Sequence, residues 1–276
     1  RPGAASGSSG LEHVVKAVII VPARMQASRF PGKMLAPLAG RPVVAYTVQA
    51  ACAVAGVEAV YVATDDALIA EAARTAGVRS LMTDPACRNG TERVAQAYAA
   101  LTAEGLQADV VINLQGDAPL TPAWVVENII AAFDDPAVSV ATPVVRCTPE
   151  TLAHFRVDRA RGQVGGTTAV ISASGRALYF SKEVLPFDGR AEGMDVWHHV
   201  GLYAFRPAAL ADYARLPQGP LETTEGLEQL RFLENDLPVC CVPVESRGFS
   251  FWEVNNPEDI ARIEALLSEK GDPNGL

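Results

Sequence analysis

The sequence of 276 residues lacks any apolar stretch of the roughly 18 residues that a membrane-spanning helix needs. Its five cysteines form no CxxC pair, so the usual spacing of zinc and redox motifs is also missing. Cys240 and Cys241 stand together in an apolar run, which is typical of small core residues. These absences favour reduced thiols and a cytoplasmic location, with no contact to a membrane.

Positive charge is scarce as well. Lys and Arg number 23 against 32 Asp and Glu, and the formal net charge is −9 at pH 7. Nucleic-acid backbones are bound by clustered Lys and Arg, so this balance argues against a general affinity for nucleic acid. A local cationic pocket is still compatible with it.

The start of the chain is rich in Gly and Ser and lacks the apolar core of a signal peptide. We expect residues 1–14 to form a flexible tail. The whole sequence is 49% hydrophobic, which is enough to bury a full core. We therefore expect a single domain over residues 15–270.

In the first half of the chain, short runs of Val and Ile alternate with Ala-rich helical patterns. The apolar runs are unbroken, as strands buried on both faces require. This rhythm is typical of an α/β fold, a parallel sheet with helices on both faces. The expected strands cover residues 16–23, 59–66 and 109–117, and the expected helices cover residues 43–55, 67–77 and 92–105.

The middle of the chain has a different pattern, of strands without helices between them. We expect a mixed or antiparallel insertion here, with residues 138–215 as a subdomain for the acceptor or a dimer partner. The last helix has Pro257 in its first turn and Gly271 as its stop. The expected strands cover residues 138–147, 166–175, 177–182, 198–206 and 239–244, and the expected helices cover residues 221–236 and 256–271.

The loop after the first strand, PARMQASRFPGK, places three cations within ten residues: Arg24, Arg29 and Lys33. In open parallel sheets, ligands bind outside the carboxyl ends of the strands. The Pro31-Gly32 turn would fold the loop over a polyphosphate, whose charge the cations would neutralise. The loop matches neither GxxxxGK[ST] nor GxGxxG, and a basic surface loop is the structural alternative.

Two further segments place polar groups beside such strand ends. Asp117 follows an apolar strand, where one carboxylate and phosphate oxygens would hold a hard metal ion; capping of the next helix is the alternative. The Asn89-Gly90-Thr91 turn would bring backbone groups close to a flat ligand. Taken alone, it is a turn followed by a helix N-cap.

Together and in this order, the motifs resemble the cytidylyltransferases that make CMP-sugar acids, above all the 3-deoxy-manno-octulosonate (KDO) cytidylyltransferases. The resemblance runs from about Ala17 to Leu267. It implies a mostly parallel, Rossmann-like nucleotidyltransferase sheet with a mixed insertion. The segments that carry it are IVPARMQASRFPGKML, YVATDD, NGTERVAQA, NLQGDAPL, GRALYFSK, HHVGLYAFR, PLETTEGLEQLRFLE and NNPEDIARIEALL.

The resemblance implies roles for the matching residues. The first loop would bind the phosphates of CTP, the Asn89 turn and Arg93 would surround the cytosine, and Asp117 with Asn255 would hold Mg²⁺. The implied CTP site comprises Ala23, Arg24, Ser28, Lys33, Asn89, Gly90, Thr91, Arg93 and Gln115, and the implied catalytic group comprises Arg24, Arg29, Lys33 and Asp117. The implied acceptor site comprises Gln115, Lys182, His199, Tyr203, Glu222, Glu225 and Gln229. From the residues alone, His199 is equally well a core histidine, and the two glutamates are equally well a solvated helix start.

Four positions depart from the family pattern. Ala118 stands where Glu normally follows QGD, and Thr168 stands where a strand lysine is usual. Lys182 replaces an arginine, and Asn255 replaces the second metal-binding carboxylate. An asparagine carbonyl can ligate Mg²⁺ but adds no charge. Because the nucleotide half is intact and the acceptor half is altered, the expected acceptor is either a compact phosphonate or a KDO-like sugar acid, with KDO itself as the alternative.

The implied activity is CTP-dependent nucleotidyl transfer. An acceptor oxygen would attack the α-phosphorus in line and pyrophosphate would leave, while Mg²⁺ and the cationic loop neutralise charge. The implied partners are CTP, a small anionic acceptor and a second copy of the chain, bound through the middle strands. A non-catalytic nucleotide-binding protein, inert because Asn255 lacks charge, is the alternative from another class.

Overall fold

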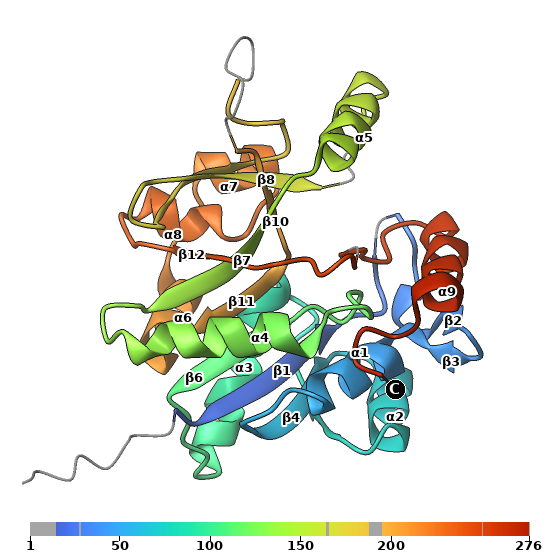
Figure 1. Ribbon diagram of the computed structural model, residues 1–276. Helices are drawn as coiled ribbons and strands as arrows, with labels where there is room; N and C mark the ends of the chain where they lie inside the picture. The colour runs from blue at the N-terminus through green and yellow to red at the C-terminus, as the bar shows by residue number, and fades with distance from the viewer. Residues whose placement is uncertain (1–14, 28, 164–165, 188–194, 250, 276) are drawn as a thin grey trace, which may run out of the picture.

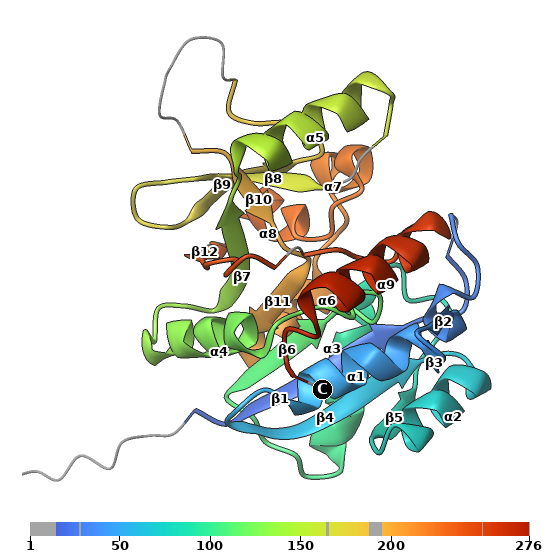
Figure 2. The same ribbon diagram turned by 45° about the vertical axis from the view of Figure 1, so that its right-hand side comes forward.

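The computed structural model describes residues 15–27, 29–163, 166–187, 195–249 and 251–275. The predicted tail of residues 1–14 and the predicted CTP ligand Ser28 lie outside these residues. The described chain forms a mixed sheet with helices on both faces (Figures 1 and 2). A two-stranded sheet of β2 (Pro37–Leu38) and β3 (Arg41–Pro42) lies beside it.

The N-terminal part of the large sheet is parallel, as the alternating strand and helix patterns predict. In spatial order its strands are β5 (Arg79–Met82), β4 (Val57–Thr64), β1 (Ala17–Ala23) and β6 (Val110–Leu114). All seven residues of β1 are buried. Ile19 and Val21 point into one hydrophobic cluster, and Val18 and Ile20 point into another on the opposite face. The unbroken apolar runs of the sequence therefore reflect burial on both sides.

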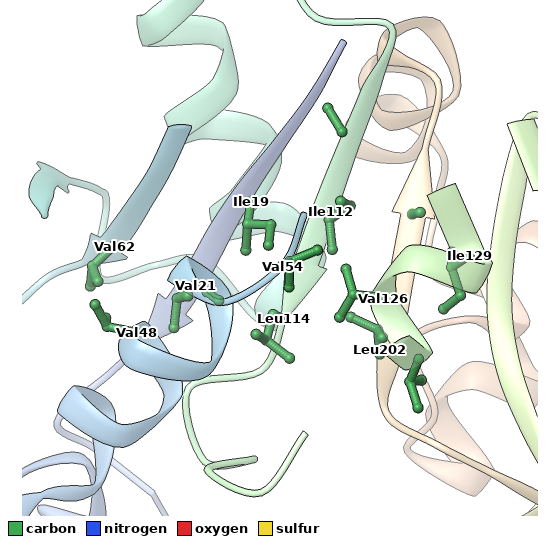
Figure 3. Packing of buried hydrophobic residues seen from close by; sticks show 14 of the residues in the cluster. Ile19, Val21, Val48, Val54, Val62, Ile112, Leu114, Val126, Ile129 and Leu202 are labelled. Atoms are coloured by element: carbon green, nitrogen blue, oxygen red, sulfur yellow. The ribbon is translucent and has the colours of Figure 1, made fainter. Parts of the chain in front are cut away.

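Helices cover the two faces of this sheet. One face is covered by α1 (Val43–Cys52), α2 (Ala67–Thr75) and α4 (Ala123–Ala131), the last followed by the short helix η2 (Ala132–Asp134). Figure 3 shows this side, where Val48 of α1 lies beside Val62 and Val21, and Val126 of α4 lies beside Ile112. The other face is covered by α3 (Gly90–Ala103) and α6 (Pro207–Arg215). The predicted fold class is confirmed.

The second half of the chain extends the same sheet with antiparallel strands. Beyond β6 the order is β11 (Leu202–Phe205), β7 (Val140–Arg146), β10 (Trp197–His199), β8 (Thr167–Ile171) and β9 (Ala177–Ser181). β12 (Cys240–Pro243) pairs with β7 in parallel. The final helix α9 (Glu258–Lys270) then packs near β2 and β3, and its C-terminal cap is Gly271.

The prediction of strands without helices between them in the middle of the chain is wrong. Helix α5 (Pro149–Ala160) lies between β7 and β8, with Thr148 as its N-cap and Pro149 in its first turn. Phe155 is its only buried residue, so the helix has almost no apolar face. Since the prediction relied on apolar periodicity, it could not detect this helix.

Two further element boundaries differ from the prediction. The segment 198–206 is two strands, because the chain leaves β10 at Val200-Gly201 and crosses to a different place in the sheet as β11. The single helix expected over 221–236 is two short helices, α7 (Pro220–Glu225) and α8 (Leu230–Glu234). Gly226 separates them in a left-handed conformation, with φ of 62°, which ends a helix readily.

Two expectations from composition can be compared with the structure. All five cysteines are free, with Cys241 buried and Cys240 half-buried. None of the helices in the described ranges is both long and apolar enough to cross a bilayer.

Candidate active site

The carboxyl ends of β1 and β6 lie side by side and bring two of the predicted segments together. The Gly116 N–H donates to the Pro22 carbonyl at 3.2 Å, which joins the strand ends. A Cβ added at Gly116 would lie 2.8 Å from that carbonyl oxygen, so only glycine allows this approach. Thr47 in α1 fixes the turn by donating its hydroxyl to the Gly116 carbonyl at 2.8 Å. Asp117 is therefore held at the edge where ligands of parallel sheets bind.

The cationic loop folds back onto this edge. The Gly32 N–H donates to the Met25 carbonyl at 2.9 Å and starts the short helix η1 (Lys33–Leu35). The Lys33 ammonium forms a salt bridge with the Asp117 carboxylate and also donates to the Val254 carbonyl at 2.9 Å. Lys33 is 9% exposed, whereas Arg24 and Arg29 are exposed. The loop thus combines one fixed cation with two at the surface.

Asp117 does not cap a helix, which was the structural alternative for it. Helix α4 begins at Ala123, after Pro122, and has no side-chain cap. Asp117 instead meets the segment that leads into α9, where the Val254 N–H donates to the Asp117 carbonyl at 2.8 Å. Asn255 of the same segment accepts a hydrogen bond from Arg29 Nη2 at 2.9 Å. The two predicted metal ligands are therefore both bonded to cations of the first loop.

The Asn89 turn forms the N-terminus of α3. Asn89 caps the helix by accepting from the Glu92 N–H at 2.9 Å, and its amide donates to Tyr213 Oη at 2.8 Å. A Cβ at Gly90 would lie 2.7 Å from Gln115 Nε2, so the turn and the end of β6 are in close contact. The N-cap that the turn alone indicated is present, and contact with cytosine stays a prediction.

Arg93 is anchored inside the protein. It is 2% exposed, and its guanidinium donates to Thr83 Oγ1 and forms a salt bridge with Asp65 at 3.1 Å. These contacts join α3 to the ends of β4 and β5. The second oxygen of Asp65, Oδ1, is buried and has no hydrogen-bond partner among the described residues.

Gln115 connects the end of β6 to the segment between α7 and α8. Its amide nitrogen donates to Asn113 Oδ1 and to Glu228 Oε1, each at 3.2 Å. Glu228 also accepts from the Thr91 N–H at 3.0 Å. Burial raises the pKa of the Glu228 carboxyl, because the charged form loses its solvation. Sequence reasoning missed Glu228, although the residue links two predicted site segments.

His199 has the surroundings of a core histidine. It is 5% exposed, shares a hydrogen bond of 2.9 Å between Nε2 and Thr142 Oγ1, and packs edge-on against Phe180. Burial lowers the pKa of His199 to about 3, so the ring is neutral near pH 7. A neutral ring would bind an anionic acceptor only as a hydrogen-bond partner.

The other predicted acceptor residues divide into two groups. Tyr203 donates to Gln229 Oε1 at 3.0 Å, and Gln229 Nε2 is buried without a partner among the described residues. Glu222 and Glu225 have structural partners instead. Glu222, 2% exposed, forms a bidentate ion pair with Arg231 at 2.7 Å for each bond, so it is not a solvated helix start. Glu225 accepts from the Lys182 N–H at 2.9 Å and from Ser181 Oγ at 2.7 Å, which ties α7 to β9.

A second carboxylate, Glu253, lies beside Asp117. Its Oε2 accepts from Asn255 Nδ2 at 3.4 Å. Burial and the nearby Asp117 raise the pKa of Glu253 to about 7. Asp117, Glu253 and the Asn255 carbonyl offer the oxygen donors that Mg²⁺ prefers, and a nucleotide would supply more. In the described part of the chain, no group of three His, Cys, Asp or Glu residues is placed to hold a metal without such help.

One groove lies away from these residues. It measures about 830 Å³ and runs between α3 and α6, where Ala and Leu side chains form much of the lining. None of the predicted site residues contributes to it. The residues of the predicted CTP site lie near the carboxyl ends of the parallel strands instead.

Comparison with known proteins decides the family. A model of the cytidylyltransferase family matches residues 18–239. The chain belongs to the cytidylyltransferase family. It is 44% identical to the 3-deoxy-manno-octulosonate cytidylyltransferase of Maricaulis maris, over 92% of this chain and 97% of the relative. It is 42% identical to the enzyme of the same name from an Anaeromyxobacter species, with the same coverage.

Solved structures agree with this assignment. A CMP:2-keto-3-deoxy-manno-octonic acid synthetase complexed with CTP has a TM-score of 0.80 and 32% identity, and covers 92% of this chain and 99% of its own. A 4-diphosphocytidyl-2C-methyl-D-erythritol synthase from Anaerococcus prevotii, at 14% identity and a TM-score of 0.57, shares the fold. This cytidylyltransferase is therefore a nucleotidyltransferase enzyme, which leaves the non-catalytic alternative without support.

Proposed function

We propose that this cytidylyltransferase transfers CMP from CTP to 3-deoxy-manno-octulosonate and releases pyrophosphate. The observation that carries the proposal is the meeting of the cationic loop, Asp117 and the Asn89 turn at one edge of the sheet. Its acceptor rests on the similarity to enzymes of that name over nearly their whole length.

The residues of this chain bind and orient the reactants. Lys33 and the exposed Arg24 and Arg29 neutralise the triphosphate, so that pyrophosphate leaves with its charge compensated. The acceptor oxygen approaches the α-phosphorus from the side of Gln115, in line with the leaving group. Arg93 and the turn at Asn89 hold the base.

Mg²⁺ is part of the proposal. Asp117 and the carbonyl of Asn255 would hold it, and the oxygen donors fit the ion. When bound, the cation neutralises phosphate charge and raises the electrophilicity of the α-phosphorus. Lys33 and Arg29 are then available to the phosphates instead of to Asp117 and Asn255.

A phosphonate is the second candidate acceptor, and Thr168 is the observation that favours it. Thr168 is fully buried, donates its hydroxyl to the Glu183 carbonyl at 2.7 Å and accepts from the Leu185 N–H at 3.2 Å. It therefore supports the loop after β9 and offers a sugar acid no replacement for the lysine usual there. A compact dianion needs fewer such partners.

Pyrophosphate release tests both acceptors. We expect CTP with KDO to be turned over with a higher kcat/KM than CTP with any of a set of short phosphonic acids. Efficient turnover of a phosphonate but not of KDO would show that the acceptor is a phosphonate. No release with any acceptor would contradict both.

We also propose that the protein is a cytoplasmic homodimer. β9 stands at one end of the strand order, and Leu178 on it is 61% exposed. Phe187, which follows β9, is 90% exposed. Beyond Ala177, whose N–H is bonded to the Val239 carbonyl, an edge strand with exposed apolar side chains is suited to association. Sedimentation of the wild type and of a Leu178→Lys variant would test this, because the variant should dissociate.

A further inference from the structure

The segment Glu253–Asn255 crosses the candidate active site. Val254 is bonded on both sides, since its N–H donates to the Asp117 carbonyl at 2.8 Å and its carbonyl accepts from Lys33 Nζ at 2.9 Å. Glu253 and Asn255 therefore flank a fixed residue. Their side chains lie on the same side of the segment, because Asn255 Nδ2 donates to Glu253 Oε2.

The half-buried Glu253 carboxylate has few partners for its charge. Its only side-chain hydrogen bond among the described residues is the one from Asn255, at 3.4 Å, which is long. No Lys or Arg of the described chain forms a salt bridge with it, and the nearby cations Lys33 and Arg29 are bonded to Asp117 and Asn255 instead. A carboxylate removed from water is costly unless a cation compensates it. The Glu253 carboxylate can therefore bind a cation.

The bend between β10 and β11 leaves space for the Glu253 carboxylate. Gly201, between β10 and β11, faces it so closely that an added Cβ would lie 2.5 Å from Glu253 Oε1. The backbone of Gly201 does not have positive φ, so conformation does not require glycine there. Its small size serves to accommodate the Glu253 side chain.

We propose that Glu253 is a carboxylate ligand of the Mg²⁺ that this enzyme uses with CTP. It supplies, two residues earlier in the chain, the negative charge that Asn255 does not carry. Asp117 and Glu253 together then hold the cation with two carboxylates, while Asn255 contributes its amide. The inference rests on the proposed CTP·Mg²⁺ reaction and assigns a residue to it that the family motif does not include.

Charge explains why this ligand matters. The strength with which a site holds Mg²⁺ or Ca²⁺ depends on the number of charged ligands. With Asp117 alone, which also faces the Lys33 ammonium, the net charge of the site would be close to zero. Glu253 adds a second negative charge to the site without any change in the phosphate-binding loop.

Mn²⁺ binding, followed by electron paramagnetic resonance with CTP present and acceptor absent, tests the proposal directly. We expect Glu253→Gln to weaken Mn²⁺ binding by about tenfold or more, the scale of lost metal-site interactions. Glu245→Gln, an exposed glutamate of the segment between β12 and α9, is the matched control and should bind like the wild type. Thermal unfolding should show both variants folded.

Two further variants separate a ligand from a merely structural residue. In Glu253→Gln/Asn255→Asp the carboxylate returns to the other position, and Mn²⁺ affinity should return to within about threefold of the wild type, since the ligand charge is restored. Gly201→Ala should displace the Glu253 side chain and weaken Mn²⁺ binding without changing any charge. In the Glu253→Gln background the same alanine should have no further effect.

The outcomes distinguish this inference from the proposed function. Wild-type Mn²⁺ affinity in Glu253→Gln, with affinity lost in Asp117→Asn, would overturn the role of Glu253 and leave the CTP site standing. Failure of Asn255→Asp to rescue binding in a folded Glu253→Gln protein would also overturn it. Absence of Mn²⁺ binding by the wild type with CTP would contradict both proposals.

Discussion

Lys33 is the residue through which the proposed phosphate loop and the proposed metal site are connected. Its ammonium contacts the Asp117 carboxylate and the Val254 carbonyl, so residues from three distant parts of the chain meet at one atom. Lys33 is nearly buried, so the loss of its partner would leave a poorly solvated cation. The charge of Asp117 is therefore important both before and after nucleotide binds.

The first prediction concerns Asp117→Asn. We expect turnover below a tenth of the wild-type rate, a barrier increase above about 1.4 kcal/mol, because the site loses a charged ligand. CTP binding should weaken but persist, since Arg24 and Arg29 are unchanged. Pyrophosphate release and calorimetric titration with CTP measure the two effects. Glu58→Gln, at an exposed position of β4, is the control. A variant with more than a tenth of the rate would show that the metal is held elsewhere.

The second prediction uses the low pKa of His199. The pKa of His199 is about 3 in the folded protein, against an ordinary value of 6.5 that applies to the unfolded chain. Between pH 3 and pH 6.5 the unfolded chain therefore binds a proton on this ring that the folded protein does not bind. The stability due to the neutral ring is complete above pH 6.5 and is lost as pH falls toward 3. At pH 5 the loss from this one group is about 2 kcal/mol.

Urea unfolding of wild type and His199→Asn at pH 5 and pH 7.5 measures this effect. The variant should lose less stability on acidification than the wild type, whatever its stability at pH 7.5. The neighbouring His198, whose pKa burial lowers to about 4, is present in both proteins. Equal losses in both proteins would show that His199 does not titrate in this range.

Sequence patterns identified the residues that belong to compact motifs and missed two that do not. Lys33 and Asp117 could be predicted because each follows a strand in a short polar segment. Glu253 could not, because its role depends on contact with Asp117, a residue far away in the chain. Glu228 was missed for a different reason. If residues 221–236 formed one unbroken helix, Glu222, Glu225 and Gln229 would share a face. The left-handed Gly226 interrupts the helix, so the residues after it do not follow that pattern.

At the scale of elements, the pair α7 and α8 supports the acceptor side of the site. Arg231 of α8 is fully buried and is neutralised by Glu222 of α7 and by Glu92 of α3. Its guanidinium also stacks over the Tyr213 ring, 4.2 Å from the centroid. Because Tyr213 receives a hydrogen bond from Asn89, this ion pair supports the turn at the N-terminus of α3.

The third prediction is that Glu222→Ala destabilises the protein by about 3–5 kcal/mol, the cost of leaving one partner of a buried ion pair without the other. We expect Glu222 to stabilise the fold through its ion pair and not to contact the acceptor. The acceptor KM of the folded fraction should change little. Urea unfolding and steady-state kinetics below the melting temperature measure the two quantities. Thr224→Ala, at an exposed position of α7, should change neither. A raised KM with unchanged stability would return Glu222 to the acceptor site.

Elements with a buried face could be predicted, and those without one could not. The strands of the parallel half and helices α1, α2 and α3 lie close to their expected ranges, because each has a recurring apolar face. Helix α5 buries a single residue and was missed. β10 and β11 were merged because only their partners in the sheet, not their residue types, separate them.

The whole molecule combines an acidic chain with a cationic pocket. With a formal net charge of −9, the protein repels polyanions at long range, and the loop with Arg24, Arg29 and Lys33 is the proposed local site for an anion. The two halves of one sheet meet at β6 and β11, so the nucleotide side and the acceptor side share a rigid frame. Such a frame favours positioning as the main source of catalysis.

We expect this frame to set the choice of nucleotide as well. The turn at Asn89 and Gly90 lies against Gln115, which limits the depth of the space beside the end of β6. Arg93 is fixed behind the turn by Thr83 and Asp65, so its guanidinium cannot move aside for a larger base. A pyrimidine is expected to fit such a cradle, and a purine would have to displace buried hydrogen-bonded groups.

The fourth prediction is therefore that CTP is used in preference to ATP and GTP by at least about a hundredfold in kcat/KM. That factor corresponds to about 2.7 kcal/mol, which is the cost of disrupting one or two buried hydrogen bonds. Pyrophosphate release with each nucleotide at a fixed acceptor concentration measures the ratio. Asp65→Asn, which weakens the anchor of Arg93 outside the triphosphate loop, should lower the preference for CTP while Mn²⁺ binding stays unchanged. Equal turnover of CTP and ATP would show that the turn at Asn89 does not surround the base, although the fold and the metal site would be unaffected.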